Sequence, residues 1–188
     1  MNDTNVDLRV KVTRQLIEDS LLALLNEGIP LSKIGVTELS AKAGINRTTF
    51  YKHFDSVQSA FHSIEDNLCF FVLDSARQSK EPGKRRIIPP GLFEFIDKNE
   101  KVALMILSAN EHGSFLDRVF EETERLYFEG LPSELVDKAE KLYSFIFGGA
   151  KEIVYQWLKN GKKESPKTIA KTIENFANGL LDGAKEGK

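Results

Sequence analysis

Apolar residues recur at three- and four-residue steps along most of this chain, and that spacing limits its fold more than any other feature. The first such run predicts a helix over residues 8–27, in which the residues that repeat at this spacing are Val12, Leu16, Ile17, Leu21, Leu24 and Leu25. No segment alternates apolar and polar residues between turn residues, as a half-buried strand would. The sequence therefore predicts an all-α protein.

Two short helices joined by a tight turn are predicted after the first helix. The earlier one spans residues 36–43 and ends at Gly44, which can take the left-handed backbone conformation that stops a helix. Asn46 can cap the next helix, residues 47–53, because its side-chain oxygen can accept from a free amide of the first turn. Two helices with this connection form a helix-turn-helix.

The end of the earlier short helix, the turn and the second short helix together carry basic residues without acidic neighbours. Lys42, Arg47 and Lys52 lie between residues 42 and 53, where there is no Asp or Glu, although the net charge of the whole chain is -2. Phe50 and Phe54 are predicted to anchor the helix in the core. A plain helical hairpin inside a core would not need these cations on its surface, so the pattern favours a surface that meets an anion.

Six further helices are predicted downstream, over residues 56–77, 90–97, 100–109, 114–129, 133–160 and 166–184. The basic segment 79–86 is expected to be an exposed loop. Gly148 and Gly149 stand out, because each glycine inside a helix costs roughly 1 kcal/mol relative to alanine. We therefore expect another helix to approach closely at these two positions.

Composition excludes several classes of protein. The first residues do not form a signal peptide and no run is long enough to cross a membrane, which predicts a cytoplasmic protein. Cys69 is the only cysteine and is expected to be a buried apolar residue. His62 and Glu65 share a helix face but are interpreted as solvated surface residues. With no phosphate loop and no nucleophile motif, we predict neither enzyme activity, nor a cofactor, nor a metal site.

Residues 35–54, GVTELSAKAGINRTTFYKHF, resemble the DNA-binding region of the tetracycline-repressor (TetR) family of bacterial transcriptional regulators, and residues 49–54 are the most specific part. Residues 147–166, FGGAKEIVYQWLKNGKKESP, resemble the regulatory domain of many bacterial members, of the type common in Firmicutes. The resemblance implies an all-helical homodimer. A three-helix DNA-binding domain would occupy residues 1–54, and a larger regulatory and dimerisation domain would occupy residues 55–188.

The function implied is that of a repressor, which binds an inverted-repeat operator in double-stranded DNA and is released by a small-molecule effector. The alternative is a DNA-bound adaptor or co-activator controlled by a protein partner. On the recognition helix and its flanks, the expected DNA-binding residues are Thr37, Asn46, Arg47, Thr48, Thr49, Tyr51, Lys52 and His53. Lys11 or Arg14 could add phosphate contacts. Many relatives have a lysine where this chain reads Asp55-Ser56-Val57-Gln58, so weaker phosphate affinity is expected.

The C-terminal region carries two further sets of candidates. An effector pocket would be lined by Phe93, Leu104, Ser108, Phe115 and Tyr127, although aromatic residues at helical spacing also pack as core. The last two helices would pair with their twins in the homodimer through Phe145, Ile146, Gly149, Ile153, Trp157, Ile169, Ile173, Phe176 and Leu180. The alternative is that these apolar stripes fill the core of a single chain.

Overall fold

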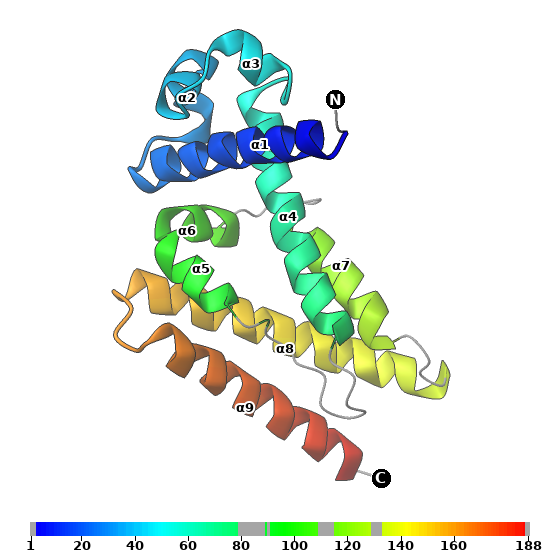
Figure 1. Cartoon of the computed structure of the whole chain (residues 1–188). Helices are drawn as coiled ribbons and strands as arrows, with labels where there is room; N and C mark the ends of the chain where they lie inside the picture. The colour runs from blue at the N-terminus through cyan, green and yellow to red at the C-terminus, as the bar shows by residue number, and fades with distance from the viewer. Residues whose placement is uncertain (1–2, 79–88, 90, 109–114, 129–132, 187–188) are drawn as a thin grey trace. The chain divides into compact units, whose positions relative to one another are not determined.

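The computed structural model describes residues 3–78, 89, 91–108, 115–128 and 133–186. Within these ranges the chain forms nine α-helices, one 3₁₀ helix and no strand, which confirms the all-α prediction (Figure 1). The basic segment 79–86 lies outside the described residues. The elements are α1 (Asp3–Asn26), η1 (Leu31–Lys33), α2 (Val36–Lys42), α3 (Arg47–Tyr51), α4 (Val57–Gln78), α5 (Leu92–Lys98), α6 (Glu100–Ser108), α7 (Phe115–Phe128), α8 (Ser133–Lys159) and α9 (Pro166–Glu186).

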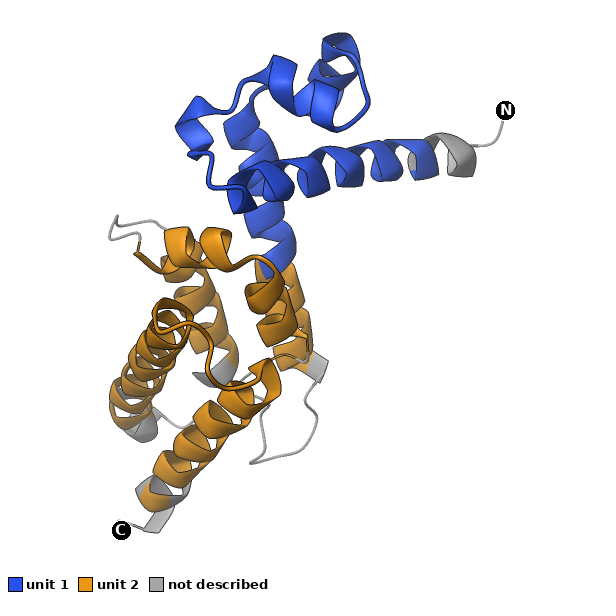
Figure 2. Ribbon diagram, turned by 90° about the vertical axis from the view of Figure 1, so that its left-hand side faces the viewer, with its two compact units in different colours: residues 1–68 blue, residues 69–188 orange. Residues whose placement is uncertain are grey.

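The chain divides into two compact units, residues 1–68 and 69–188 (Figure 2). The division falls inside α4, whereas the sequence placed the expected boundary after residue 54. The first turns of α4 belong to unit 1, and they contribute the buried side chains Val57, Ala60, Phe61 and Ile64.

Unit 1 has an apolar core made by α1, α2, α3 and the start of α4. Ile17, Leu21, Leu39 and Phe50 have no exposed surface at all. The prediction for the first helix was only partly correct, because Val12 and Leu16 are 52% and 46% exposed. They lie well away around α1 from the buried residues Ile17, Leu21, Leu24 and Leu25, so the apolar residues of this helix are not confined to the face that the core covers.

Unit 2 is organised around an apolar cluster of residues from α5, α6, α8 and α9. Its buried members are Phe93, Ala103, Val154, Trp157, Leu158, Ile169 and Ile173. The rings of Phe93 and Trp157 lie 6.2 Å apart between centroids. The indole Nε1 of Trp157 donates to the carbonyl of Glu164 at 3.0 Å, which ties α8 to the start of α9. On α4, the side chain of Phe71 is 40% exposed.

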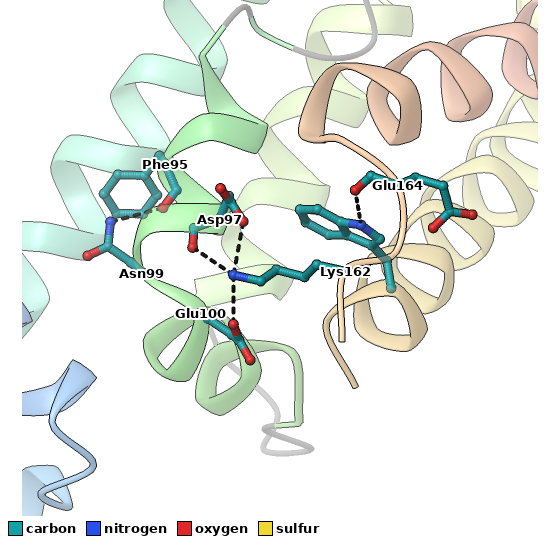
Figure 3. A network of polar contacts seen from close by, with 7 residues as sticks. Phe95, Asp97, Asn99, Glu100, Lys162 and Glu164 are labelled. Atoms are coloured by element: carbon teal, nitrogen blue, oxygen red, sulfur yellow. Dashed lines mark hydrogen bonds and ion pairs between the residues drawn. The ribbon is translucent and has the colours of Figure 1, made fainter. Parts of the chain in front are cut away.

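The turn between α8 and α9 is fastened to the corner between α5 and α6 by Lys162 (Figure 3). Its Nζ lies 2.9 Å from Asp97 Oδ1 and 2.8 Å from Glu100 Oε2. Hydrogen bonds to Glu100 and then Asp97 raise the pKa of Lys162, so the ammonium form is favoured. The backbone of Lys162 is left-handed, with φ 52°, a conformation that is unfavourable for a residue with a side chain. The two carboxylates therefore hold a strained residue in place.

Candidate nucleic-acid interface

The turn between α2 and α3 has the hydrogen bonds of a glycine-terminated helix. Gly44 has φ 67°, and its amide donates to the carbonyl of Ala41 at 3.1 Å. The amide of Ile45 donates to the carbonyl of Ser40 at 3.0 Å, which completes the Schellman pattern. Ser40 itself is 2% exposed and is small enough to lie within this packed turn. The predicted helix-turn-helix geometry is therefore present.

Asn46 caps α3 as predicted. Its Oδ1 accepts from the amide of Thr49 at 2.8 Å, and its backbone is extended, as is usual at this position. The helix ends at Tyr51, earlier than the expected end near His53. The reason is that the amides of Lys52 and His53 donate three residues back, at 3.2 and 2.9 Å, which tightens the last turn.

Two phenylalanines anchor α3 in the core of unit 1, as predicted. Phe50 is 0% and Phe54 is 5% exposed. Because the inner face of α3 is occupied by Phe50, the other side chains of this short helix point away from the core. Arg47, Thr48 and Lys52 are exposed, Tyr51 is 49% exposed, and Thr49 and His53 are half-buried. Thr37 on α2 is exposed as well.

The cations of this region are not equivalent. Lys42 forms an ion pair with Glu27 at 2.5 Å, so part of its charge is neutralised within the protein. In the part of the chain that the structure describes, no ion pair involves Arg47 or Lys52. The pKa of His53 is lowered by burial, and then by the positive charges of Arg14 and Lys52, so its imidazole favours the neutral form.

Arg14 has a role that the sequence did not reveal. Instead of extending toward a phosphate, its guanidinium lies inside unit 1, with Nη1 3.0 Å from the carbonyl oxygen of His53 and Nη2 2.9 Å from Ser63 Oγ. The guanidinium carbon also lies 4.3 Å from the centre of the Phe54 ring. The expectation that Arg14 contacts DNA is therefore corrected. The sequence signal for an inward Arg14 was its position on α1, about one turn before Ile17 and Glu18, which are both buried.

The start of α4 has no cation, as the sequence indicated. Instead, Ser56 and Ser59 form a reciprocal cap. The amide of Ser59 donates to Ser56 Oγ at 3.0 Å, and the amide of Ser56 donates to Ser59 Oγ at 3.0 Å. This cap fixes the first turn of α4 directly after the recognition helix and its turn.

The residues proposed for an effector pocket are placed in different surroundings. Phe93 and Leu104 pack in the cluster of unit 2, and Phe115 is 9% exposed. Ser108 is exposed and donates to the carbonyl of Met105 at 3.1 Å. The side chain of Tyr127 lies outside the described residues. A polar contact that the sequence did not predict joins Thr123 of α7 to Tyr143 of α8, beside the rings of Phe120 and Phe147.

The residues proposed for the dimer interface divide into two groups. Trp157, Ile169 and Ile173 are buried in the core of their own chain, which is the alternative that the sequence left open. Ile146 and Ile153 are half-buried. The outward group consists of Phe145, which is 68% exposed, Phe176, which is 60% exposed, Leu180, which is 38% exposed, and Gly149.

The helix glycines also face outward. A Cβ added at Gly148, Gly149, Gly179 or Gly183 would meet nothing within 4 Å. The close approach that we expected at Gly148 and Gly149 is therefore not made by a helix of the same chain, as far as the described residues show.

The last features considered are metal-binding clusters and membrane-spanning helices. The described ranges contain no group of three or more His, Cys, Asp or Glu side chains placed to hold a metal ion. His62 and Glu65 form a simple pair one helical turn apart, at 2.8 Å, and His62 is 68% exposed. None of the helices described is long and apolar enough to cross a membrane.

Sequence comparisons support a regulator. Residues 91–179 match the TetR-type family described as "Transcriptional regulator C-terminal region". The chain is 22% identical over 189 residues to the uncharacterized HTH-type transcriptional regulator YxbF of Bacillus subtilis (strain 168). That alignment covers 93% of this chain but 47% of YxbF, so the chain spans about half the length of this curated relative.

Solved structures share the fold. The fatty acid degradation regulator FadR of Bacillus halodurans matches with a TM-score of 0.69 and 17% identity, over 89% of this chain and 95% of that one. A TetR transcriptional regulator from Streptococcus agalactiae 2603V matches with a TM-score of 0.59 and 19% identity, over 94% and 99%. These relatives are transcriptional regulators rather than enzymes. The match of residues 91–179, the related regulator sequence and the shared fold agree that this chain is similar to transcriptional regulators of the TetR type.

Proposed function

We propose that the chain is a repressor that binds an inverted-repeat operator as a homodimer in the cytoplasm. The observation that carries this proposal is the presentation of α3. Asn46 caps the helix, Phe50 anchors it from behind, and Arg47 and Thr48 stand exposed with no ion pair to Arg47 among the described residues. A short helix presented in this way can enter the major groove and offer its first side chains to base edges.

The residues of α3 and its flanks have two roles in this proposal. Arg47, Thr48 and Thr49 read bases, because an arginine can donate twice to guanine and a threonine methyl can contact thymine. The others hold the helix in register by contacting phosphates, which carry no sequence information. These residues are Thr37, Asn46, Tyr51, Lys52 and His53.

Dimerisation follows from the small number of cations. One recognition helix with Arg47 and Lys52 neutralises few phosphates, so high affinity requires two such helices about 34 Å apart or a further helical turn beyond. The exposed residues Phe145, Phe176 and Leu180 support a dimer, because large apolar side chains left exposed to water favour burial against a partner. The glycines beside them leave space for the helices of a second chain.

Release by an effector is the regulatory part of the proposal. The dimer can have conformations that differ in the distance between the two recognition helices. A ligand that binds unit 2 more tightly in one of these conformations would shift the dimer toward it. The FadR neighbour is a regulator of fatty acid degradation, but 17% identity supports only its fold here, so no ligand class is carried over.

Control by a protein partner is the second candidate. It is favoured by the placement of Phe93 and Leu104, which pack against other side chains in the core of unit 2 rather than lining an effector pocket. Phe70 on α4 is 65% exposed and adds apolar surface of the kind that binds another protein. This candidate keeps the same DNA-binding residues and changes only the signal.

The test is selection of a duplex from a randomised pool, followed by binding measurements with three variants. Arg47→Ala and Thr48→Ala should each change the base preference at one position of both half-sites. Lys52→Ala should weaken binding to all sequences and reduce the salt slope by about 1. Lys98→Ala, an exposed lysine on α5, is the matched control and should leave both unchanged. If the parent selects no duplex, or a site without twofold symmetry, the proposal is wrong.

A further inference from the structure

Four polar side chains connect α1 to α4 inside unit 1, and we call them the Arg14 network: Arg14, Glu18, Ser63 and Asn67. Ser63 Oγ donates to Glu18 Oε1 at 2.7 Å and accepts from Arg14 Nη2 at 2.9 Å. Asn67 Nδ2 donates to the other oxygen of Glu18 at 3.2 Å. Each contact crosses from one helix to the other.

The direction of these bonds is determined by the groups involved. A serine hydroxyl has one proton, and an arginine can only donate, so the order must be Arg14 to Ser63 to Glu18. Glu18 is 5% exposed, and a carboxylate with so little access to water requires hydrogen-bond donors. Ser63 therefore holds Arg14 and Glu18 at the same time.

The remaining part of the Arg14 guanidinium reaches the DNA-binding segment. Its Nη1 donates to the carbonyl of His53, and its flat face covers the ring of Phe54. Lys52 and His53 form the turn directly after α3, where the helical hydrogen bonds have already changed to the three-residue type. The carbonyl of His53 thus has a donor from α1 that is itself fixed by α4.

We propose that Arg14 and Ser63 are positioning residues for DNA binding, which hold the Lys52–His53 turn at the distance from α4 at which its side chains meet the phosphate backbone. This inference rests on the proposed function. It assigns no DNA contact to either residue, and it explains why Arg14 is turned inward.

Loss of the Ser63 hydroxyl has a specific consequence. Arg14 and Glu18 are four residues apart on one helix, a spacing at which opposite charges pair directly. Without the hydroxyl between them, the guanidinium moves toward Glu18 and leaves the His53 carbonyl. Ser63→Ala should therefore have the same effect on DNA binding as Arg14→Gln, although Ser63 does not contact the DNA-binding segment.

The experiment measures binding of a fluorescent duplex, selected by the parent protein from a randomised pool, to full-length variants. Ser63→Ala and Arg14→Gln should each weaken binding about tenfold, which corresponds to about 1.4 kcal/mol. The double variant should also lose about tenfold rather than about a hundredfold, because both changes break the same connection. The salt slope should fall by about 0.9 in each, as when one phosphate contact is lost.

Asn67→Ala is the matched control, because it removes a donor to Glu18 but leaves Arg14 and Ser63 in contact. It should bind within about twofold of the parent. Thermal unfolding confirms that each variant is folded at the assay temperature. If Arg14→Gln is not folded, the comparison of Ser63→Ala with Asn67→Ala decides, and equal affinities overturn the inference.

Other results also overturn it. They are parent-like binding by both single variants, or losses that multiply in the double variant. Failure of the parent to select any duplex would instead refute the proposed function. The two failures are therefore distinguishable.

Discussion

Phe176 offers the most direct test of the proposed homodimer. The ring is 60% exposed in the single chain, and it lies on the same face of α9 as Gly179, Leu180 and Gly183. If a second chain covers this face, replacement by alanine should separate the two chains without affecting the core of either. Ile169 and Ile173 lie nearer the start of α9 on the same apolar stripe and are buried, whereas Phe176 and Leu180 further along it are exposed.

The magnitude follows from the exposed fraction. A phenylalanine has roughly 200 Å² to bury, so 60% exposure leaves about 120 Å² for a partner. At about 25 cal/mol per Å², this area contributes about 3 kcal/mol. A twofold interface contains the residue twice, which gives at most about 6 kcal/mol. The dimer dissociation constant should rise by about 100-fold or more, with a limit near 10⁴-fold.

Sedimentation equilibrium over a range of protein concentrations measures this change. Phe70→Ala is the matched control, because Phe70 is similarly exposed, at 65%, but lies on α4. It should dimerise like the parent protein. Circular dichroism should show unchanged helix content in Phe176→Ala. The reasoning is refuted if Phe176→Ala dimerises as tightly as the parent, or if the parent is a monomer at micromolar concentration.

Three further changes have clear expected outcomes. Asn46→Ala should lower the free energy of unfolding by about 1 kcal/mol in urea, whereas Asn46→Asp, which keeps an acceptor for the Thr49 amide, should not. Lys162→Ala loses two ion pairs, so its free energy of unfolding should fall by about 1 kcal/mol. Lys162→Gly loses the same ion pairs but relieves the left-handed backbone strain, so it should be about 1 kcal/mol more stable than Lys162→Ala. Equal urea midpoints for the two variants would contradict this. The pKa of His53 is lowered from 6.5 in the free protein, and a DNA phosphate would raise it, so the complex binds more protons than the free protein. Duplex affinity should therefore increase as pH falls through about 6.5 and below in the parent protein but not in His53→Gln, and a flat profile in the parent would exclude this role.

The same shift has a consequence for folding. Because the folded protein binds the His53 proton less readily than the unfolded chain, the stability linked to this group is complete above about pH 6.5 and is lost as pH falls below it. In titrations by NMR, the imidazole of His53 should therefore titrate below the usual histidine value of about 6.5.

Local signals in the sequence determined most of the helix boundaries. The end of α2 at Gly44 and the start of α3 after Asn46 depend on a left-handed glycine and on one side-chain cap. The long helices α8 and α9 follow the three- and four-residue spacing of their apolar residues. These features involve neighbours within a few positions, so they can be read from the chain without knowledge of its packing.

The tertiary structure decided what each apolar or charged face meets. Periodicity shows that one side of a helix is apolar, but it does not show whether the chain's own helices or another molecule covers that side. Trp157 and Ile173 are therefore buried in their own chain while Phe145 and Phe176 on the same two helices are exposed. Arg14 likewise points inward, toward Ser63 and the His53 carbonyl. These partners are about 40 or more positions away in sequence and become its neighbours only through folding, so the orientation of Arg14 could not be predicted from the sequence.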